Sequence, residues 1–85
     1  MTNYKVYTKN GCKYCDMVKK LLKNHKTTFI NMSVMQTEEY QQLRDELIAK
    51  TNHRTFPWVF QGDNFIGGYT ELNKKLMMSN NNLNF

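Results

Sequence analysis

Two cysteines, Cys12 and Cys15, stand two residues apart in the segment KNGCKYCDM and carry the clearest chemistry of this sequence. A pair at this spacing can form a structural disulfide, supply half of a metal site or act as a reactive redox couple. A thiol attacks another sulfur atom only as a thiolate, so a reactive pair needs groups that stabilise negative charge. Lys9 and Lys13 flank the first cysteine and supply positive charge.

Zinc is the main alternative for this pair. Tetrahedral zinc uses four ligands, usually two cysteine pairs or one pair with two closely spaced histidines. The sequence has no third cysteine, and its two histidines, His25 and His53, are 28 residues apart. We therefore expect no metal at the cysteines and interpret both histidines as surface residues.

The residues that follow Cys12 predict a helix from this cysteine to about Asn24. Apolar side chains recur there at helical spacing, and lysines together with Asp16 occupy the opposite side. Free backbone N–H groups and the positive end of the helix dipole would then stabilise the Cys12 thiolate. Cys15 projects to the border of the apolar stripe. We expect Cys12 to be the exposed nucleophile and Cys15 to be its shielded partner.

The other elements follow from hydrophobic periodicity and turn residues. Strands are predicted at 3–8, 27–32, 58–60 and 64–66, and further helices from Thr37 onward and at 70–78, the last one capped by Thr70. A crossover helix makes the first two strands parallel, and turn residues make the last two a hairpin. The order β-α-β-α-β-β-α predicts an α/β fold, a four-stranded mixed sheet with helices on both faces.

Composition and charge narrow the class of protein. The 85 residues, 40% hydrophobic and 22% charged, are typical of one globular domain, which we place at 1–79 with a loosely held asparagine-rich tail at 80–85. The sequence shows no membrane span and no secretory signal, so we expect a cytoplasmic protein. The net charge is +5, and the excess of positive charge lies within residues 1–27, but no nucleic-acid-binding motif accompanies it.

Three blocks identify a resemblance: YTKNGCKYC at 7–15, RTFP at 54–57 and IGGYTEL at 66–72. Together with the order of elements they resemble the glutaredoxin family, small proteins of thioredoxin-like fold, and are similar to its short dithiol members. The resemblance implies a monomeric oxidoreductase that uses glutathione to reduce protein disulfides and glutathione mixed disulfides. It implies that Cys12 attacks the disulfide and that Cys15 resolves mixed disulfides with proteins. No nucleic acid, membrane or metal is expected as a partner.

The resemblance also implies a glutathione site. The matching positions are Lys9, Tyr14, Arg44, Thr55, Phe56, Pro57, Gly68, Tyr69, Thr70 and Glu71. Lys9 and Arg44 would hold the glycine carboxylate, and a cis Pro57 would let the backbone of Phe56 pair with the cysteinyl part. The helix start after Gly68 would seat the γ-glutamyl carboxylate. Glu71, where the family often has Asp, would contact the ammonium group.

Ordinary structural roles stay open for several of these residues. Arg44 projects into an apolar stripe, where an unpaired charge is costly, yet it could also reach solvent from the edge of that stripe. Phe56 could be a core residue and Thr55 a strand-edge residue. Gly67 and Gly68 could form a plain turn before a capped helix.

The dipeptide Lys13-Tyr14 departs from the family's commonest Pro-Tyr, so the helix loses a rigid start. Family members without that proline sometimes hold a 2Fe–2S cluster with glutathione. A cluster carrier is therefore the first alternative function, although the presence of Cys15 fits a dithiol catalyst better. A second alternative is a hydrogen donor to ribonucleotide reductase that takes electrons from thioredoxin reductase.

Overall fold

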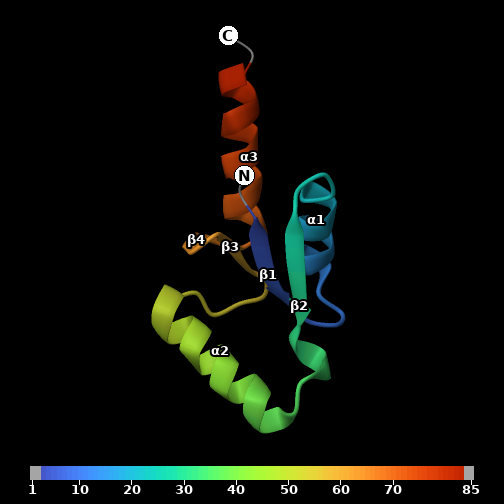
Figure 1. Ribbon diagram of the computed structural model, residues 1–85, viewed down its shortest axis with the longest axis vertical. Helices are drawn as coiled ribbons and strands as arrows, with labels where there is room; N and C mark the ends of the chain where they lie inside the picture. The colour runs from blue at the N-terminus through green and yellow to red at the C-terminus, as the bar shows by residue number, and fades with distance from the viewer. Residues whose placement is uncertain (1–2, 84–85) are drawn as a thin grey trace.

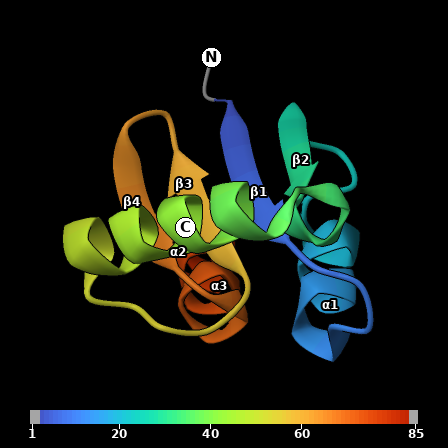
Figure 2. The same ribbon diagram turned by 90° about the horizontal axis from the view of Figure 1, so that it is seen from below.

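The computed structural model describes residues 3–83, with side chains described as far as residue 78. The elements in chain order are β1 (Tyr4–Thr8), α1 (Lys13–Leu21), β2 (Thr27–Asn31), η1 (a 3₁₀ turn, Met32–Val34), α2 (Thr37–Thr51), β3 (Trp58–Gln61), β4 (Asn64–Gly67) and α3 (Tyr69–Leu83). The strands form one sheet in the order β2-β1-β3-β4. α2 lies across one face, and α1 and α3 lie on the other (Figures 1 and 2). The predicted α/β architecture is confirmed.

Strand pairing follows the prediction in detail. β1 runs parallel to β2, with Tyr4 opposite Thr27, and antiparallel to β3 on its other side. β3 and β4 form the expected hairpin, and Gly62 takes a φ of +61° in its turn, a conformation that suits glycine. β1 is therefore a central strand, and its C-terminal end leads straight into the cysteine loop.

Two layers of core side chains hold the helices against the sheet. Between the sheet and the pair α1 and α3 lie Tyr4, Val6, Val18, Leu22, Val59 and Leu72. Between the sheet and α2 lie Met32, Leu47, Trp58 and Phe60. Successive strand residues point to opposite faces, so β3 contributes to both layers. Burial of Val18 and Leu22 fixes α1, and with it the position of the cysteine loop.

The end of α1 differs from the prediction, whereas the start of α2 agrees with it. α1 ends at Leu21 rather than near Asn24, because the chain tightens there into a 3₁₀-type bond from the Lys23 N–H to the Lys20 carbonyl at 3.4 Å. α2 begins at Thr37 as expected, although its N-cap is Gln36 and forms no side-chain hydrogen bond.

The N-terminus of α3 has a different cap from the predicted one. The helix begins at Tyr69, and Oε1 of Glu71 accepts a hydrogen bond from the N–H of Gly68 at 2.7 Å. A capping box has two hydrogen bonds, and in one of them a glutamate at the third helical position accepts from the backbone N–H of the N-cap residue, as Glu71 does here. The prediction that Thr70 caps the helix is therefore wrong, because Thr70 already lies inside its first turn.

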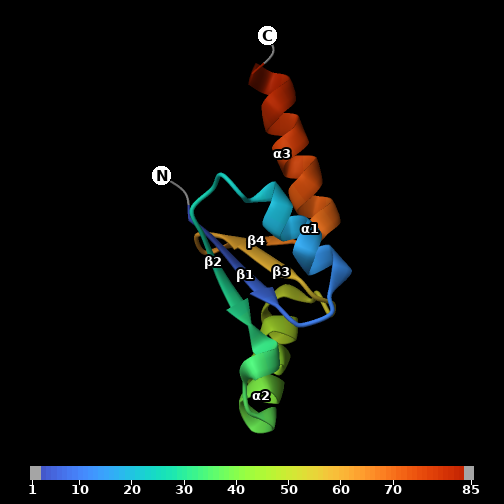
Figure 3. The ribbon, with the colours of Figure 1, turned by 90° about the vertical axis from the view of Figure 1, so that its right-hand side faces the viewer.

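α3 is also longer than predicted. It continues past Met78 to Leu83 and extends beyond the sheet (Figure 3). Neither glycine nor proline interrupts this stretch, and asparagine costs a helix less than about 0.7 kcal/mol per residue. The predicted loose tail is thus helical at 80–83, while 84–85 lie outside the described residues. Within residues 3–83, no helix is both long enough and apolar enough to cross a membrane.

Candidate active site

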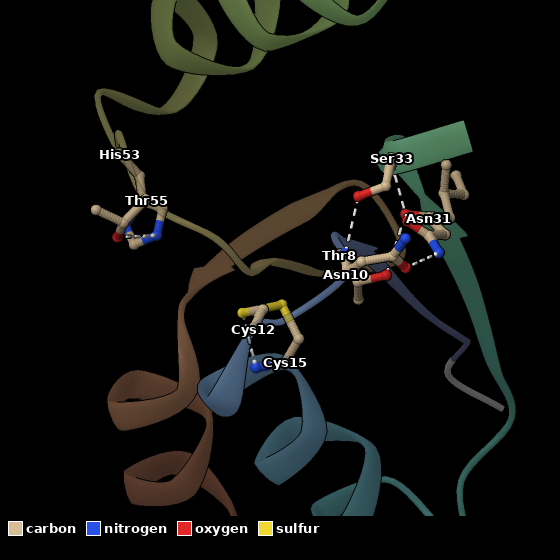
Figure 4. Close-up of a disulfide and its surroundings, with 9 residues drawn as sticks. Thr8, Asn10, Cys12, Cys15, Asn31, Ser33, His53 and Thr55 are labelled. Atoms are coloured by element: carbon tan, nitrogen blue, oxygen red, sulfur yellow. Dashed lines mark hydrogen bonds between the residues drawn. A yellow bond between two sulfur atoms is a disulfide. The ribbon is translucent and has the colours of Figure 1, made fainter. Parts of the chain in front are cut away.

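Cys12 is the N-cap residue of α1 and lies immediately above the first turn of the helix. Its backbone is extended, with φ −107° and ψ 107°, and its Sγ accepts a hydrogen bond from the N–H of Cys15 at 3.1 Å. The two cysteines form a disulfide, with their Cα atoms 5.2 Å apart (Figure 4). The helix start therefore directs a backbone N–H at the sulfur atom predicted to be the nucleophile.

The two cysteines differ in exposure in the predicted order, but both are largely buried. Cys12 is 9% exposed and Cys15 is 1% exposed. The expectation of an exposed Cys12 is therefore wrong for this disulfide form. Cys12 shares the lining of a surface hollow with these two residues. An incoming sulfur would have to approach through that hollow.

A side-chain network anchors the loop that precedes Cys12. The backbone N–H of Asn10 donates to Oγ of Ser33 at 2.8 Å, and Nδ2 of Asn31 donates to Oδ1 of Asn10 at 2.9 Å. The N–H of Ser33 donates in turn to Oδ1 of Asn31 at 2.9 Å (Figure 4). The loop after β1 is thereby held to the end of β2. Sequence reasoning missed this network, since these side chains meet only through the parallel pairing of the two strands.

The peptide bond between Phe56 and Pro57 is cis, as the resemblance implied. The Phe56 ring packs edge-on against Trp58, with centroids 4.8 Å apart, and stacks on Tyr40 at 6.3 Å. The ordinary interpretation of Phe56 as a packing residue is therefore correct for its side chain, and Phe56 also lines the hollow at Cys12. The indole N–H of Trp58 donates to the carbonyl of His53 at 3.1 Å and so fixes the segment before the cis proline.

The hollow at Cys12 has a basic lining and a volume of about 300 Å³. Its residues are Lys9, Cys12, Tyr40, Arg44, Arg54, Thr55 and Phe56. Three of the seven are cations, and the described residues that line it include no carboxylate. Nζ of Lys9 lies 5.3 Å from the centroid of the Phe56 ring. The structure thus brings Lys9 and Arg44 to the nucleophile from two distant elements, and adds Arg54, which sequence reasoning left out although it begins the RTFP block.

A second hollow of about 230 Å³ adjoins the first one. It is lined by Tyr14, His53, Thr55, Phe56, Pro57, Gly68, Tyr69, Thr70 and Glu71. Thr55 and Phe56 line both hollows, so together these form one groove that passes the cis proline. All ten residues predicted to bind glutathione line this groove. The structure brings them together, whereas their binding role stays a prediction.

The start of α3 closes the second hollow with a carboxylate. Gly67 has a φ of +132°, and a Cβ at this position would lie 2.7 Å from Cβ, Cγ and Oε1 of Glu71. The glycine therefore makes room for the Glu71 side chain, which folds back to the N–H of Gly68. The double glycine is thus more than a plain turn, because it lets an acidic side chain fold over the N-terminus of α3.

The prediction for the histidines is half correct. His25 is exposed, but His53 is half-buried and lines the second hollow. Sequence reasoning had no periodicity to place His53, because it lies in the irregular segment between α2 and β3. Among residues 3–83, no group of three or more His, Cys, Asp or Glu side chains could hold a metal ion.

Comparison with protein families matches residues 5–66 to glutaredoxin. This segment contains both cysteines, the cis proline and most of the sheet. The chain belongs to the glutaredoxin family. It is 31% identical to glutaredoxin 3 of Escherichia coli over 72 residues, which is 85% of this chain and 83% of that protein. Human mitochondrial glutaredoxin-2 is 32% identical over 69 residues, 81% of this chain and 42% of the relative, so the chain spans less than half of that protein.

Solved structures agree with this assignment. The buckwheat glutaredoxin–glutathione complex superposes with a TM-score of 0.84 at 28% identity, covering 92% of this chain and 71% of that one. A dithiolic glutaredoxin from Trypanosoma brucei brucei gives a TM-score of 0.81 at 31% identity, covering 89% and 78%. The thioredoxin-like fold expected from the sequence is confirmed.

Proposed function

We propose that this glutaredoxin reduces disulfides with electrons from glutathione, using Cys12 as the nucleophile and Cys15 as the resolving thiol. One observation carries the proposal. Cys12 opens onto a groove that has cations at one end, Lys9, Arg44 and Arg54, and Glu71 at the other. Glutathione has a carboxylate at its glycine end and both an ammonium and a carboxylate at its γ-glutamyl end. A ligand of this charge pattern fits the groove with its sulfur at Cys12.

The placement of glutathione follows from the lining of the groove. The glycine carboxylate pairs with Lys9 and Arg44, since guanidinium and ammonium groups form strong hydrogen bonds with carboxylates. The backbone of Phe56 pairs with the cysteinyl unit beside the cis proline. The γ-glutamyl ammonium meets Glu71 in the second hollow. The buckwheat relative, solved as a complex with glutathione, supports this choice of ligand.

The reaction with a glutathionylated protein needs Cys12 alone. Its thiolate attacks the glutathione sulfur of the mixed disulfide, the new Cys12–glutathione disulfide forms, and the protein leaves as a thiolate. A second glutathione thiolate then attacks the bound glutathione sulfur. Oxidised glutathione leaves, and the Cys12 thiolate is restored with its electron pair. The N–H of Cys15 that points at the Cys12 sulfur favours both the attacking and the leaving thiolate.

Reduction of a protein disulfide uses both cysteines. Cys12 attacks one sulfur of the client, and Cys15 then attacks Cys12, which releases the reduced client and leaves the intramolecular disulfide described above. Two glutathione molecules reduce that disulfide again. Ribonucleotide reductase is one such client to test, and the reducing cytoplasm, where glutathione keeps thiols reduced, is the compartment that we propose.

The test is a glutathione-reductase-coupled assay that follows NADPH oxidation with a glutathionylated peptide as substrate. Wild type and Cys15→Ser should both turn over, whereas Cys12→Ser should fall to the uncatalysed rate. With a protein disulfide as substrate, Cys15→Ser should lose most of its activity. An inactive wild-type protein would contradict the proposal. The alternatives would then be examined by iron loading with visible absorbance and by a thioredoxin-reductase-coupled assay.

A further inference from the structure

His53 is held in place by its own backbone. It follows Asn52, which ends α2 in the left-handed conformation with φ 59°. The His53 N–H donates to Oγ1 of Thr51 at 3.1 Å, and its carbonyl accepts the indole N–H of Trp58 at 3.1 Å. Both main-chain groups are therefore bonded, and the position from which the imidazole projects is fixed.

The imidazole ring is fixed as well. It packs edge-on against Trp58 with centroids 5.7 Å apart and lies tilted against Phe65 at 5.4 Å. Its Nε2 is 3.4 Å from Oγ1 of Thr55 (Figure 4), and a Cβ added to Gly68 would lie 3.5 Å from the same nitrogen. The Nε2 edge therefore faces the second hollow between the cis-proline segment and the start of α3.

The same hollow lacks one of its expected donors. A helix start ordinarily offers its first N–H groups to a bound carboxylate. Here the N–H of Gly68 already bonds to Oε1 of Glu71 at 2.7 Å, so it does not point freely at a ligand. Among the described residues that line this hollow, the side chains that can titrate are those of His53, Glu71 and two tyrosines, and Glu71 is the only carboxylate of these. A carboxylate that enters beside Glu71 therefore finds one donor fewer at this helix start, and a further donor in the hollow would strengthen its binding.

We propose that Nε2 of His53 supplies this donor by hydrogen-bonding the α-carboxylate of the γ-glutamyl group of glutathione. The inference rests on the proposed function and adds a ligand-binding residue to it. Glu71 then takes the ammonium and His53 takes the carboxylate of one amino-acid head group. His53 thereby makes the groove select the γ-glutamyl group, rather than any anionic thiol.

The test measures the equilibrium between Cys12 and oxidised glutathione in the Cys15→Ser protein, by mass spectrometry. Cys12 thiolate and oxidised glutathione give the Cys12–glutathione disulfide and one glutathione thiolate. His53→Phe keeps a ring against Trp58 and Phe65 but removes the nitrogen. It should lower this equilibrium constant about tenfold, the effect of about 1.4 kcal/mol for a hydrogen bond to a charged group. His25→Phe, an exposed histidine beside Tyr4, is the matched control and should leave the constant unchanged.

A second disulfide separates ligand contact from structural damage. Cysteinylglycine disulfide lacks the γ-glutamyl group, so His53→Phe should leave its equilibrium with Cys12 unchanged. An equal loss with both disulfides would show a structural role and overturn the proposal, as would no loss with either. If only the proposal for His53 is wrong, the wild type still turns over the glutathionylated peptide. If the wild type is inactive with that peptide, the proposed function itself is wrong.

Discussion

Replacing Trp58 with phenylalanine tests what holds the cis-proline segment in place. The Trp58 side chain is fully buried, packs against Phe56, and donates its indole N–H to the carbonyl of His53 at 3.1 Å. Trp58→Phe preserves a six-membered ring in this position. It removes two ring carbons and the N–H, and it leaves the His53 carbonyl without this donor.

The expected loss follows from these two terms. Two buried carbons contribute about 0.8 kcal/mol each, and the hydrogen bond contributes about 1 kcal/mol. The free energy of unfolding should therefore fall by about 2–3 kcal/mol. For a domain of this size, each kcal/mol shifts the melting temperature by about 4–8 °C, so Tm should fall by roughly 10–20 °C.

The assay is urea denaturation followed by far-ultraviolet circular dichroism, with the disulfide intact. Fluorescence is unsuitable because Trp58 is the single tryptophan of the chain. Tyr14→Phe is the matched control, since it also removes a hydrogen-bonding group from an aromatic residue, but at a side chain that is 53% exposed. It should change stability by less than about 0.5 kcal/mol. A loss below about 1 kcal/mol for Trp58→Phe would refute the reasoning, because it would show that neither the packing nor the hydrogen bond matters there.

Three further predictions concern the groove and its supports. Arg44→Met should raise KM for a glutathionylated peptide about tenfold with kcat unchanged, since a charge-assisted contact to the glycine carboxylate is lost; a change in kcat alone in the coupled assay would contradict this. Asn31→Ala removes the bonds to Asn10 and Ser33 and should cost about 1–2 kcal/mol of stability, with faster hydrogen exchange at the Asn10 amide. Gly67→Ala meets Glu71 at 2.7 Å and a φ of +132°, and should cost about 2–3 kcal/mol in thermal melts. The control Gly62→Ala, in open space at φ +61°, should cost about 1 kcal/mol, and equal losses would count against the steric argument.

Local patterns account for most of the fold. The stripe that contains Val18 and Leu22 predicted α1, and both side chains are buried as expected. A crossover helix predicted the parallel pairing of β1 with β2, and the turn around Gly62 predicted the hairpin. These features depend on residues close together in the chain, where side-chain period and turn chemistry act directly.

Arg44 shows how a departure from a local pattern can predict a site. A charge within an apolar stripe needs a partner or a route to solvent, and the structure places it on the basic hollow beside Cys12. Arg54 does not interrupt an apolar stripe, because it lies in the irregular segment between α2 and β3, so no local pattern marked it as a site residue. Its place on the same hollow, beside Thr55 and Phe56, is seen only in the tertiary structure.

The sequence by itself determined the order of the elements, the position of Cys12 at a helix start and the family to which the chain belongs. Only the tertiary structure decided that Glu71 caps α3 at Gly68, that Asn31 holds Asn10, and that the ring of His53 faces the groove. The two asparagines are 21 residues apart and meet through strand register, which no periodicity encodes. The Glu71 cap depends on the backbone at Gly67, and the direction of the His53 ring depends on the side chains packed around it.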